Sequence, residues 1–173
     1  MRSVEDQSVK DEPVMGLSSG DVPWMRERNG KRIVELAIDS GAAVSVVPKG
    51  TFNEPLQITE RVKSETYRSA SGHAMPNLAE QHVLAKASNG ANFGLTVQIA
   101  GVMKPLISVQ EICQKGNEVI FSREKPVTRN ISSGVELEMT KKNGQYVIEL
   151  EVNGVDGDPV AGSTFSRPEQ NLR

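Results

Sequence analysis

Short runs in which apolar and polar residues alternate dominate the middle of the chain. Val135, Leu137 and Met139 share one side of such a run, and residues 145–152 repeat the alternation after Asn143-Gly144. A period of two residues predicts β-strands, and an Asn-Gly pair between two runs predicts a hairpin. The same criteria predict strands over 32–38, 43–47, 56–62, 66–70, 73–83, 81–87, 92–100, 117–121, 135–140 and 145–152.

One segment carries the signals of a helix instead. Ser108 stands three residues before Glu111, which is a capping-box spacing, and Gly116 supplies a stop. These signals predict one short helix near 109–115. We therefore expect an all-β domain, arranged as a closed barrel with one short helix and a C-terminal β-hairpin.

The two ends of the chain lack this patterning. Residues 1–30 are mostly polar and are interrupted by proline and glycine, and the residues after Gly154 have the same character. This composition predicts a disordered leader over 1–30 and a disordered tail over 154–173. The intervening residues, 31–153, have the length of one domain. They contain no visible internal repeat.

Composition narrows the function classes. The formal net charge of the 173 residues is −2, whereas a nucleic-acid-binding surface needs a basic patch. No apolar run reaches the roughly 18 residues of a membrane span, and the N-terminus has no hydrophobic signal core, so we expect a cytoplasmic protein without membrane contact. Cys113 is the only cysteine, and His73 and His82 are the only histidines. We therefore expect no disulfide, no metal site and no cofactor.

Asp39-Ser40-Gly41-Ala42 is the strongest candidate for chemistry. It separates two apolar runs, so it places a carboxylate in a turn between two strands. A carboxylate at such a position is costly unless it is hydrogen-bonded, and a hydroxyl and a glycine directly after it suit that need. Read alone, the motif also fits an ordinary aspartate that caps its own turn.

Residues 31–121 resemble the retropepsins, the aspartic proteases of retroviruses and retrotransposons. Three features carry the resemblance: the Asp39 tetrad, the hairpin around Ala70-Ser71-Gly72, and the block from Pro105 to Phe121. The stretch LISVQEICQKGNEVIF, followed by a hairpin at Gly144-Gln145-Tyr146-Val147, is similar to copia-type retrotransposon polyproteins. The resemblance implies a retropepsin-like barrel and an aspartic endopeptidase that processes a retroelement polyprotein.

The resemblance also implies a homodimer, because the chain has a single Asp-Ser-Gly-Ala tetrad. Each subunit would contribute one Asp39 to a dyad on the two-fold axis. Ser40 would hydrogen-bond across that axis, Gly41 would let the backbone approach the substrate, and Ala42 would line the groove. The hairpin tip would close as a flap over an extended peptide; its residues are Ala70, Ser71, Gly72 and His73.

Some residues depart from the family pattern. Ser108 stands where retropepsins usually have glycine, and an expected ion pair is replaced by apolar residues at 43, 44 and 109. The dimer would then rest more on apolar packing. The alternative function is a catalytically inactive or domesticated module of the same fold, which binds peptides or dimerises. On composition alone, Ser71-Gly72 fits an ordinary hairpin tip equally well, His73 fits a solvated turn residue, and Cys113 fits a small buried residue.

Overall fold

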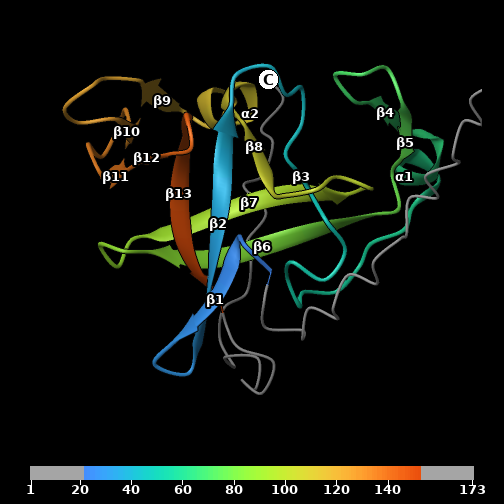
Figure 1. Cartoon of the computed structure of the whole chain (residues 1–173), viewed down its shortest axis with the longest axis horizontal. Helices are drawn as coiled ribbons and strands as arrows, with labels where there is room; N and C mark the ends of the chain where they lie inside the picture. The colour runs from blue at the N-terminus through green and yellow to red at the C-terminus, as the bar shows by residue number, and fades with distance from the viewer. Residues whose placement is uncertain (1–21, 153–173) are drawn as a thin grey trace, which may run out of the picture.

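The computed structural model describes residues 22–152, which form mainly β-strands with two short helices (Figure 1). The expected all-β class is therefore confirmed. The strands are β1 (Met25–Arg28), β2 (Lys31–Asp39), β3 (Val46–Val47), β4 (Thr66–Arg68), β5 (Ala74–Pro76), β6 (Ala79–Ala87), β7 (Asn92–Ile99), β8 (Leu106–Ser108), β9 (Asn117–Ile120), β10 (Val127–Asn130), β11 (Glu136–Glu138), β12 (Thr140–Lys142) and β13 (Gln145–Val152). The helices are α1 (Glu60–Ser64) and α2 (Val109–Gln114).

Backbone pairing links six strands in a series that starts and ends at β2. The series runs from β2 through β8, β3, β7, β6 and β13, and β13 pairs with β2 again. The β2–β8 and β3–β7 pairs are parallel, and the others in the series are antiparallel. In the β2–β8 register, Asp39 lies opposite Ser108. The turn after β2 and the start of α2 are therefore neighbours.

β2 runs through the hydrophobic core. Every residue from Ile33 to Ile38 is buried, as expected for a strand covered on both faces. Glu35 is the one charged residue in this stretch, and it is ion-paired with Arg26 at 3.3 Å and with Lys142 at 2.8 Å. Strand β6 instead alternates, and its buried residues are Ala79, Gln81, Val83, Ala85 and Ala87.

Two Asn-Gly pairs form the tight hairpins that the dipeptide favours. The expected turn at Asn143-Gly144 joins β12 to β13, with φ of 49° and 76°. Asn29-Gly30 has the same geometry, with φ of 53° and 72°, and joins β1 to β2. The prediction that residues up to 30 form a disordered leader is therefore wrong for 25–30, because this stretch is paired to β2. The rest of that leader up to residue 21, and the predicted tail over 154–173, lie outside the described residues.

Several predicted elements have different bounds in the structure. The strand expected over 56–62 is wrong: Gln57 makes an isolated bridge to Glu80, and the chain then enters α1, whose N-cap is Thr59. There are thus two short helices rather than one. The strand expected over 43–47 is reduced to β3, and the run 135–140 divides between β11 and β12. The helix near 109–115 is confirmed as α2, with Ser108 as its N-cap.

Candidate active site

Asp39 lies at the C-terminal end of β2 and is partly exposed. Its Oδ1 accepts a hydrogen bond from the backbone N–H of Gly41 at 2.8 Å. Within residues 22–152, its Oδ2 has no hydrogen-bond partner. The turn therefore fixes one carboxylate oxygen and leaves the other available to a water or a second carboxyl group.

Gly41 leaves room for this close approach. A Cβ at position 41 would lie 3.3 Å from Asp39 Oδ1, which is tighter than ordinary side-chain contacts. Ser40 and Gly41 are exposed, and Ala42 is partly exposed. The predicted residues of the tetrad are thus presented together at the molecular surface.

A buried hydroxyl holds the turn from behind. Ser108 is fully buried, and its Oγ donates to the backbone carbonyl of Ala42 at 2.7 Å. The Ser108 N–H donates to Ser45 Oγ at 3.0 Å, and Glu111 Oε2 accepts from the Ser45 N–H at 2.9 Å. The Asp39 turn is therefore tied to the first turn of α2 by hydrogen bonds.

Part of this network could be predicted from the sequence. Ser108 Oγ accepts from the Glu111 N–H at 3.3 Å, so the serine caps α2 as expected. In a full capping box the glutamate would reach back to the Ser108 N–H. Here the Glu111 carboxylate accepts from the Ser45 N–H instead. The spacing of residues around the helix does not predict a contact with a residue so far away in the chain.

The hairpin predicted to act as a flap is formed by β4 and β5. Its tip is closed by the Ser69 N–H donating to the His73 carbonyl at 3.0 Å and by Gly72 at φ 82°. The Ser71 hydroxyl lies 2.8 Å from His73 Nδ1 and is also paired with Ser69 Oγ at 2.9 Å. Residues 70–73 are all exposed.

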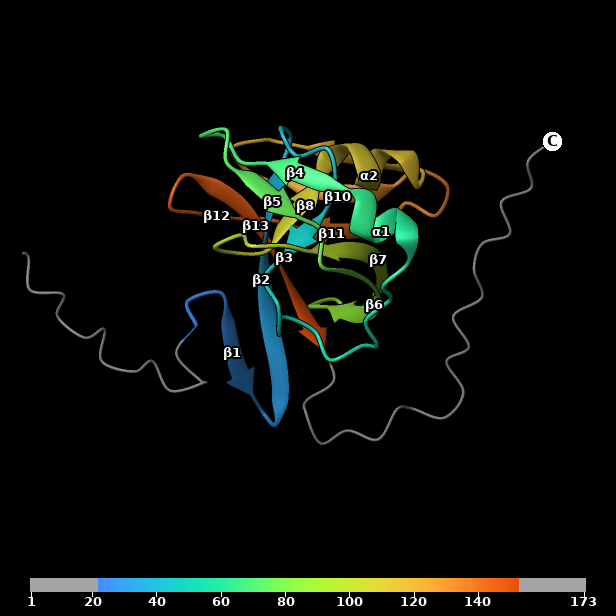
Figure 2. The same ribbon diagram turned by 90° about the vertical axis from the view of Figure 1, so that its right-hand side faces the viewer.

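The tip and the Asp39 turn lie at the same end of the molecule, as Figures 1 and 2 both show. In the described part of the chain no hydrogen bond joins residues 39–42 to residues 70–73. The structure thus places the two predicted halves of the site on one end of the domain, but it does not bring them into contact.

The base of the hairpin is anchored by a polar network. The buried Asn77 donates from Nδ2 to Glu65 Oε2 at 3.1 Å, to the Tyr67 hydroxyl at 3.0 Å and to Gln98 Oε1 at 2.7 Å. The hydrogen bond from Tyr67 is the largest influence that lowers the pKa of Glu65, and burial raises the pKa of Tyr67. At neutral pH this network therefore holds an ionised Glu65 and a protonated Tyr67.

The remaining candidate residues carry no comparable arrangement. Cys113 is exposed on α2, so the expectation that it is a small buried residue is wrong. His82 is half-buried on β6, where Nδ1 lies 3.0 Å from Thr96 Oγ1. Among residues 22–152, no group of three or more His, Cys, Asp or Glu side chains could hold a metal ion. The same residues include no helix long and apolar enough to cross a membrane.

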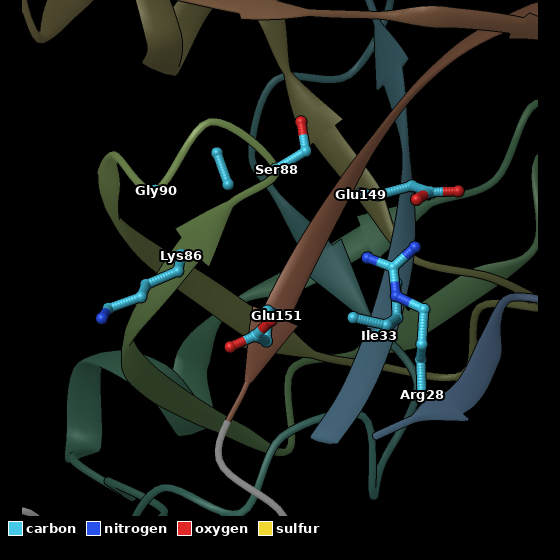
Figure 3. Close-up of a pocket in the computed structure, with 8 residues that line it drawn as sticks. Arg28, Ile33, Lys86, Ser88, Gly90, Glu149 and Glu151 are labelled. Atoms are coloured by element: carbon cyan, nitrogen blue, oxygen red, sulfur yellow. The ribbon is translucent and has the colours of Figure 1, made fainter. Parts of the chain in front are cut away.

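A separate pocket lies at the opposite end of β2, where Ile33 contributes to its wall (Figure 3). Its charged lining side chains are Arg28, Lys86, Glu149 and Glu151. Both carboxylates are occupied by ion pairs, from Arg26 to Glu149 at 2.6 Å and from Lys31 to Glu151 at 2.5 Å. These ion pairs join β1 and β2 to β13, which is a structural role.

Comparison with family models, with curated proteins and with solved structures gives no match. The function is therefore inferred from the residues and from their geometry in this structure.

Proposed function

We propose that this chain is a retropepsin-like aspartic endopeptidase that acts as a homodimer in the cytoplasm on a retroelement polyprotein. The observation that carries the proposal is the Asp39 turn: one carboxylate oxygen is fixed by Gly41, and the other is free of partners in the described chain. The series of pairings that returns to β2 is consistent with a closed barrel of the retropepsin type.

The chemistry needs two such carboxylates. Two carboxyl groups about 3 Å apart cannot both be ionised, so they share one proton and hold one water. The ionised group accepts a proton from the water as it attacks the scissile carbonyl, and the protonated group donates a hydrogen bond to the carbonyl oxygen. In the proposed dimer each subunit supplies one Asp39, and the two-fold axis passes between them.

The residues next to Asp39 and at the hairpin tip would hold the dimer and the peptide. Ser40 hydrogen-bonds across the axis, and Gly41 and Ala42 lie along the bound peptide. The exposed tip, residues 70–73, closes over the peptide and excludes water. The peptide binds in an extended conformation, with alternate side chains entering pockets on the protein.

Replacement of Asp39 with Asn tests the proposal. We expect cleavage of a peptide library between pH 3.5 and 7 to fall by about 10²- to 10⁴-fold, because the dyad loses its acid–base pair. Pepstatin should inhibit the unaltered protein. Glu149→Gln, which changes a carboxylate on β13 opposite Glu35 and away from the Asp39 turn, is the matched control and should retain cleavage.

Each result has a separate meaning. Equal cleavage by Asp39→Asn, with the fold intact by circular dichroism, would reject Asp39 as the catalytic acid. Absence of cleavage by the unaltered protein, combined with saturable peptide binding, would favour the alternative, an inactive peptide-binding module of the same fold.

A further inference from the structure

A pocket of about 440 Å³ lies between the base of the β4–β5 hairpin and α2. Its wall includes Val44, which is two residues beyond Ala42 of the catalytic turn. The charged and aromatic side chains that line it are Arg61, Glu65, Tyr67, Glu80 and Glu111. The pocket thus adjoins the proposed active site and contains three carboxylates against one guanidinium.

The single cation of the pocket is already engaged. Arg61 donates to Glu65 Oε1 at 2.8 Å and to Glu80 Oε2 at 2.5 Å. Burial raises the pKa of Glu80, but hydrogen bonds from Gln98 and Arg61 outweigh it, and the net effect is a lowered pKa. Two of the three carboxylates are therefore ionised and paired at neutral pH, and the guanidinium has no capacity to neutralise a third.

The third carboxylate, Glu111, has a hydrogen-bond partner for only one of its two oxygens. Glu111 Oε2 accepts from the Ser45 N–H, and its Oε1 has no partner in the described part of the chain. Glu111 projects from α2, whereas Arg61 belongs to α1, and no ion pair joins them. An unneutralised acceptor therefore faces the pocket from the side of the catalytic turn.

A second polar group that contacts the pocket wall also has an unsatisfied atom. Asn77 is 5 % exposed, and its Oδ1 is buried without a hydrogen-bond partner in the described chain. The Nδ2 of the same amide contacts three residues of the pocket wall, namely Glu65, Tyr67 and Gln98. All three contacts are to oxygen atoms, so the amide cannot be turned round without placing its oxygen against them. An unsatisfied buried acceptor thus belongs to the same amide that donates to three residues of the pocket wall.

We infer that this pocket binds the positively charged side chain of a lysine or arginine in the peptide substrate. The inference rests on the proposed function for the presence of a bound peptide. A long basic side chain can lay its apolar stem along Val44 and place its N–H donors among the carboxylates. Cleavage would then favour peptides with a basic residue within a few positions of the scissile bond.

Matched peptides test this preference through binding as well as cleavage. Extended fluorescent peptides with lysine, norleucine or glutamate at each position are titrated against Asp39→Asn protein, which retains the pocket but does not cleave. At one position we expect lysine to bind about tenfold more tightly than norleucine, and the ratio to fall as salt is raised. Values of kcat/KM for the unaltered protein should show the same preference.

Two variants shift the preference in opposite directions. Glu111→Gln keeps an oxygen for the Ser45 N–H but removes the charge, so the ratio of lysine to norleucine binding should fall several-fold. Arg61→Gln removes the competing cation, so the ratio should rise. Each variant is judged by its ratio of lysine to norleucine binding, so a general loss of binding affects both peptides equally and leaves the ratio unchanged.

The outcomes separate the inference from the proposed function. Efficient cleavage with no preference for a basic residue, or a preference that Glu111→Gln leaves unchanged, would overturn the inference and leave the protease intact. Lysine-selective binding without cleavage would support the pocket and reject the enzyme. Absence of any peptide binding would overturn both.

Discussion

At the scale of single residues, Glu54 is a carboxylate that the fold partly buries with one of its two oxygens unsatisfied. Its Oε2 is buried and accepts no hydrogen bond from the described residues, and burial raises its pKa above the ordinary value of 4.5. A raised pKa means that the folded state binds the proton more tightly than the unfolded chain does. Ionised Glu54 therefore costs stability at neutral pH, and this cost disappears in acid.

We expect Glu54→Gln to raise the free energy of unfolding at pH 7 by up to about 1 kcal/mol, since it removes a charge that burial disfavours. At pH 3 Glu54 is protonated, so the variant should gain nothing there. Urea unfolding at both pH values measures the difference. Glu60→Gln is the control, because the Glu60 side chain is 90 % exposed and, within residues 22–152, pairs only with Lys63. An equal gain at pH 3 would contradict the explanation.

Prediction from the sequence succeeded for residues whose role is local. Asp39, Ser40 and Gly41 were expected in a tight turn with a satisfied carboxylate, and the Gly41 N–H supplies that bond. The role of Glu111 was missed, because its carboxylate binds Ser45, which lies 66 residues away in the chain. Spacing within a helix cannot reveal such a partner.

At the scale of elements, the sequence likewise predicts the strands whose signals are local and misses those without such a signal. The Asn-Gly hairpins at residues 29–30 and 143–144 carry the signal in the dipeptide itself, and the one at residues 29–30 was missed only because the strand before it is polar. Strand β1 is exposed along most of its length, so its sequence shows no apolar alternation. The segment 56–62 contains Leu56 and Ile58, which suggested a strand, but both are about half exposed and α1 begins soon after them.

The two helices offer a matched test of how the Asp39 turn is held. Thr59 caps α1 through a bond from the Val62 N–H at 3.2 Å, whereas Ser108 caps α2 and also binds the Ala42 carbonyl. Loss of a cap costs about 1 kcal/mol, and a carbonyl left without its partner adds about 1–3 kcal/mol. We therefore expect Ser108→Ala to destabilise the protein more than Thr59→Ala in urea unfolding.

The amount by which Ser108→Ala lowers the free energy of unfolding beyond Thr59→Ala measures the hydrogen bond from Ser108 to the Ala42 carbonyl. Ser108→Ala should also reduce peptide cleavage, because the Asp39 turn loses its support, and Thr59→Ala should not. Equal destabilisation by the two substitutions would show that Ser108 acts only as a cap.

At the scale of the whole molecule, the arrangement depends on pairings between distant strands. β2 pairs in parallel with β8, although about 70 residues separate Ala37 from its partner Leu106. The pattern of apolar residues indicates that β2 is covered on both faces, but it does not say which strands are its neighbours. The expected all-β class therefore followed from the sequence, whereas the order of strands required the structure.

The proposed dimer makes a quantitative prediction about mixed subunits. If each site needs Asp39 from both partners, mixing equal amounts of unaltered and Asp39→Asn protein leaves about one quarter of the dimers with two aspartates. After subunit exchange, cleavage per total protein should therefore fall to about one quarter of the value for unaltered protein. Independent monomeric sites would retain about one half. Kinetic assays on pre-incubated mixtures, with sedimentation velocity to confirm the dimer, distinguish the two cases, and dilution with serum albumin in place of the variant gives the reference of one half.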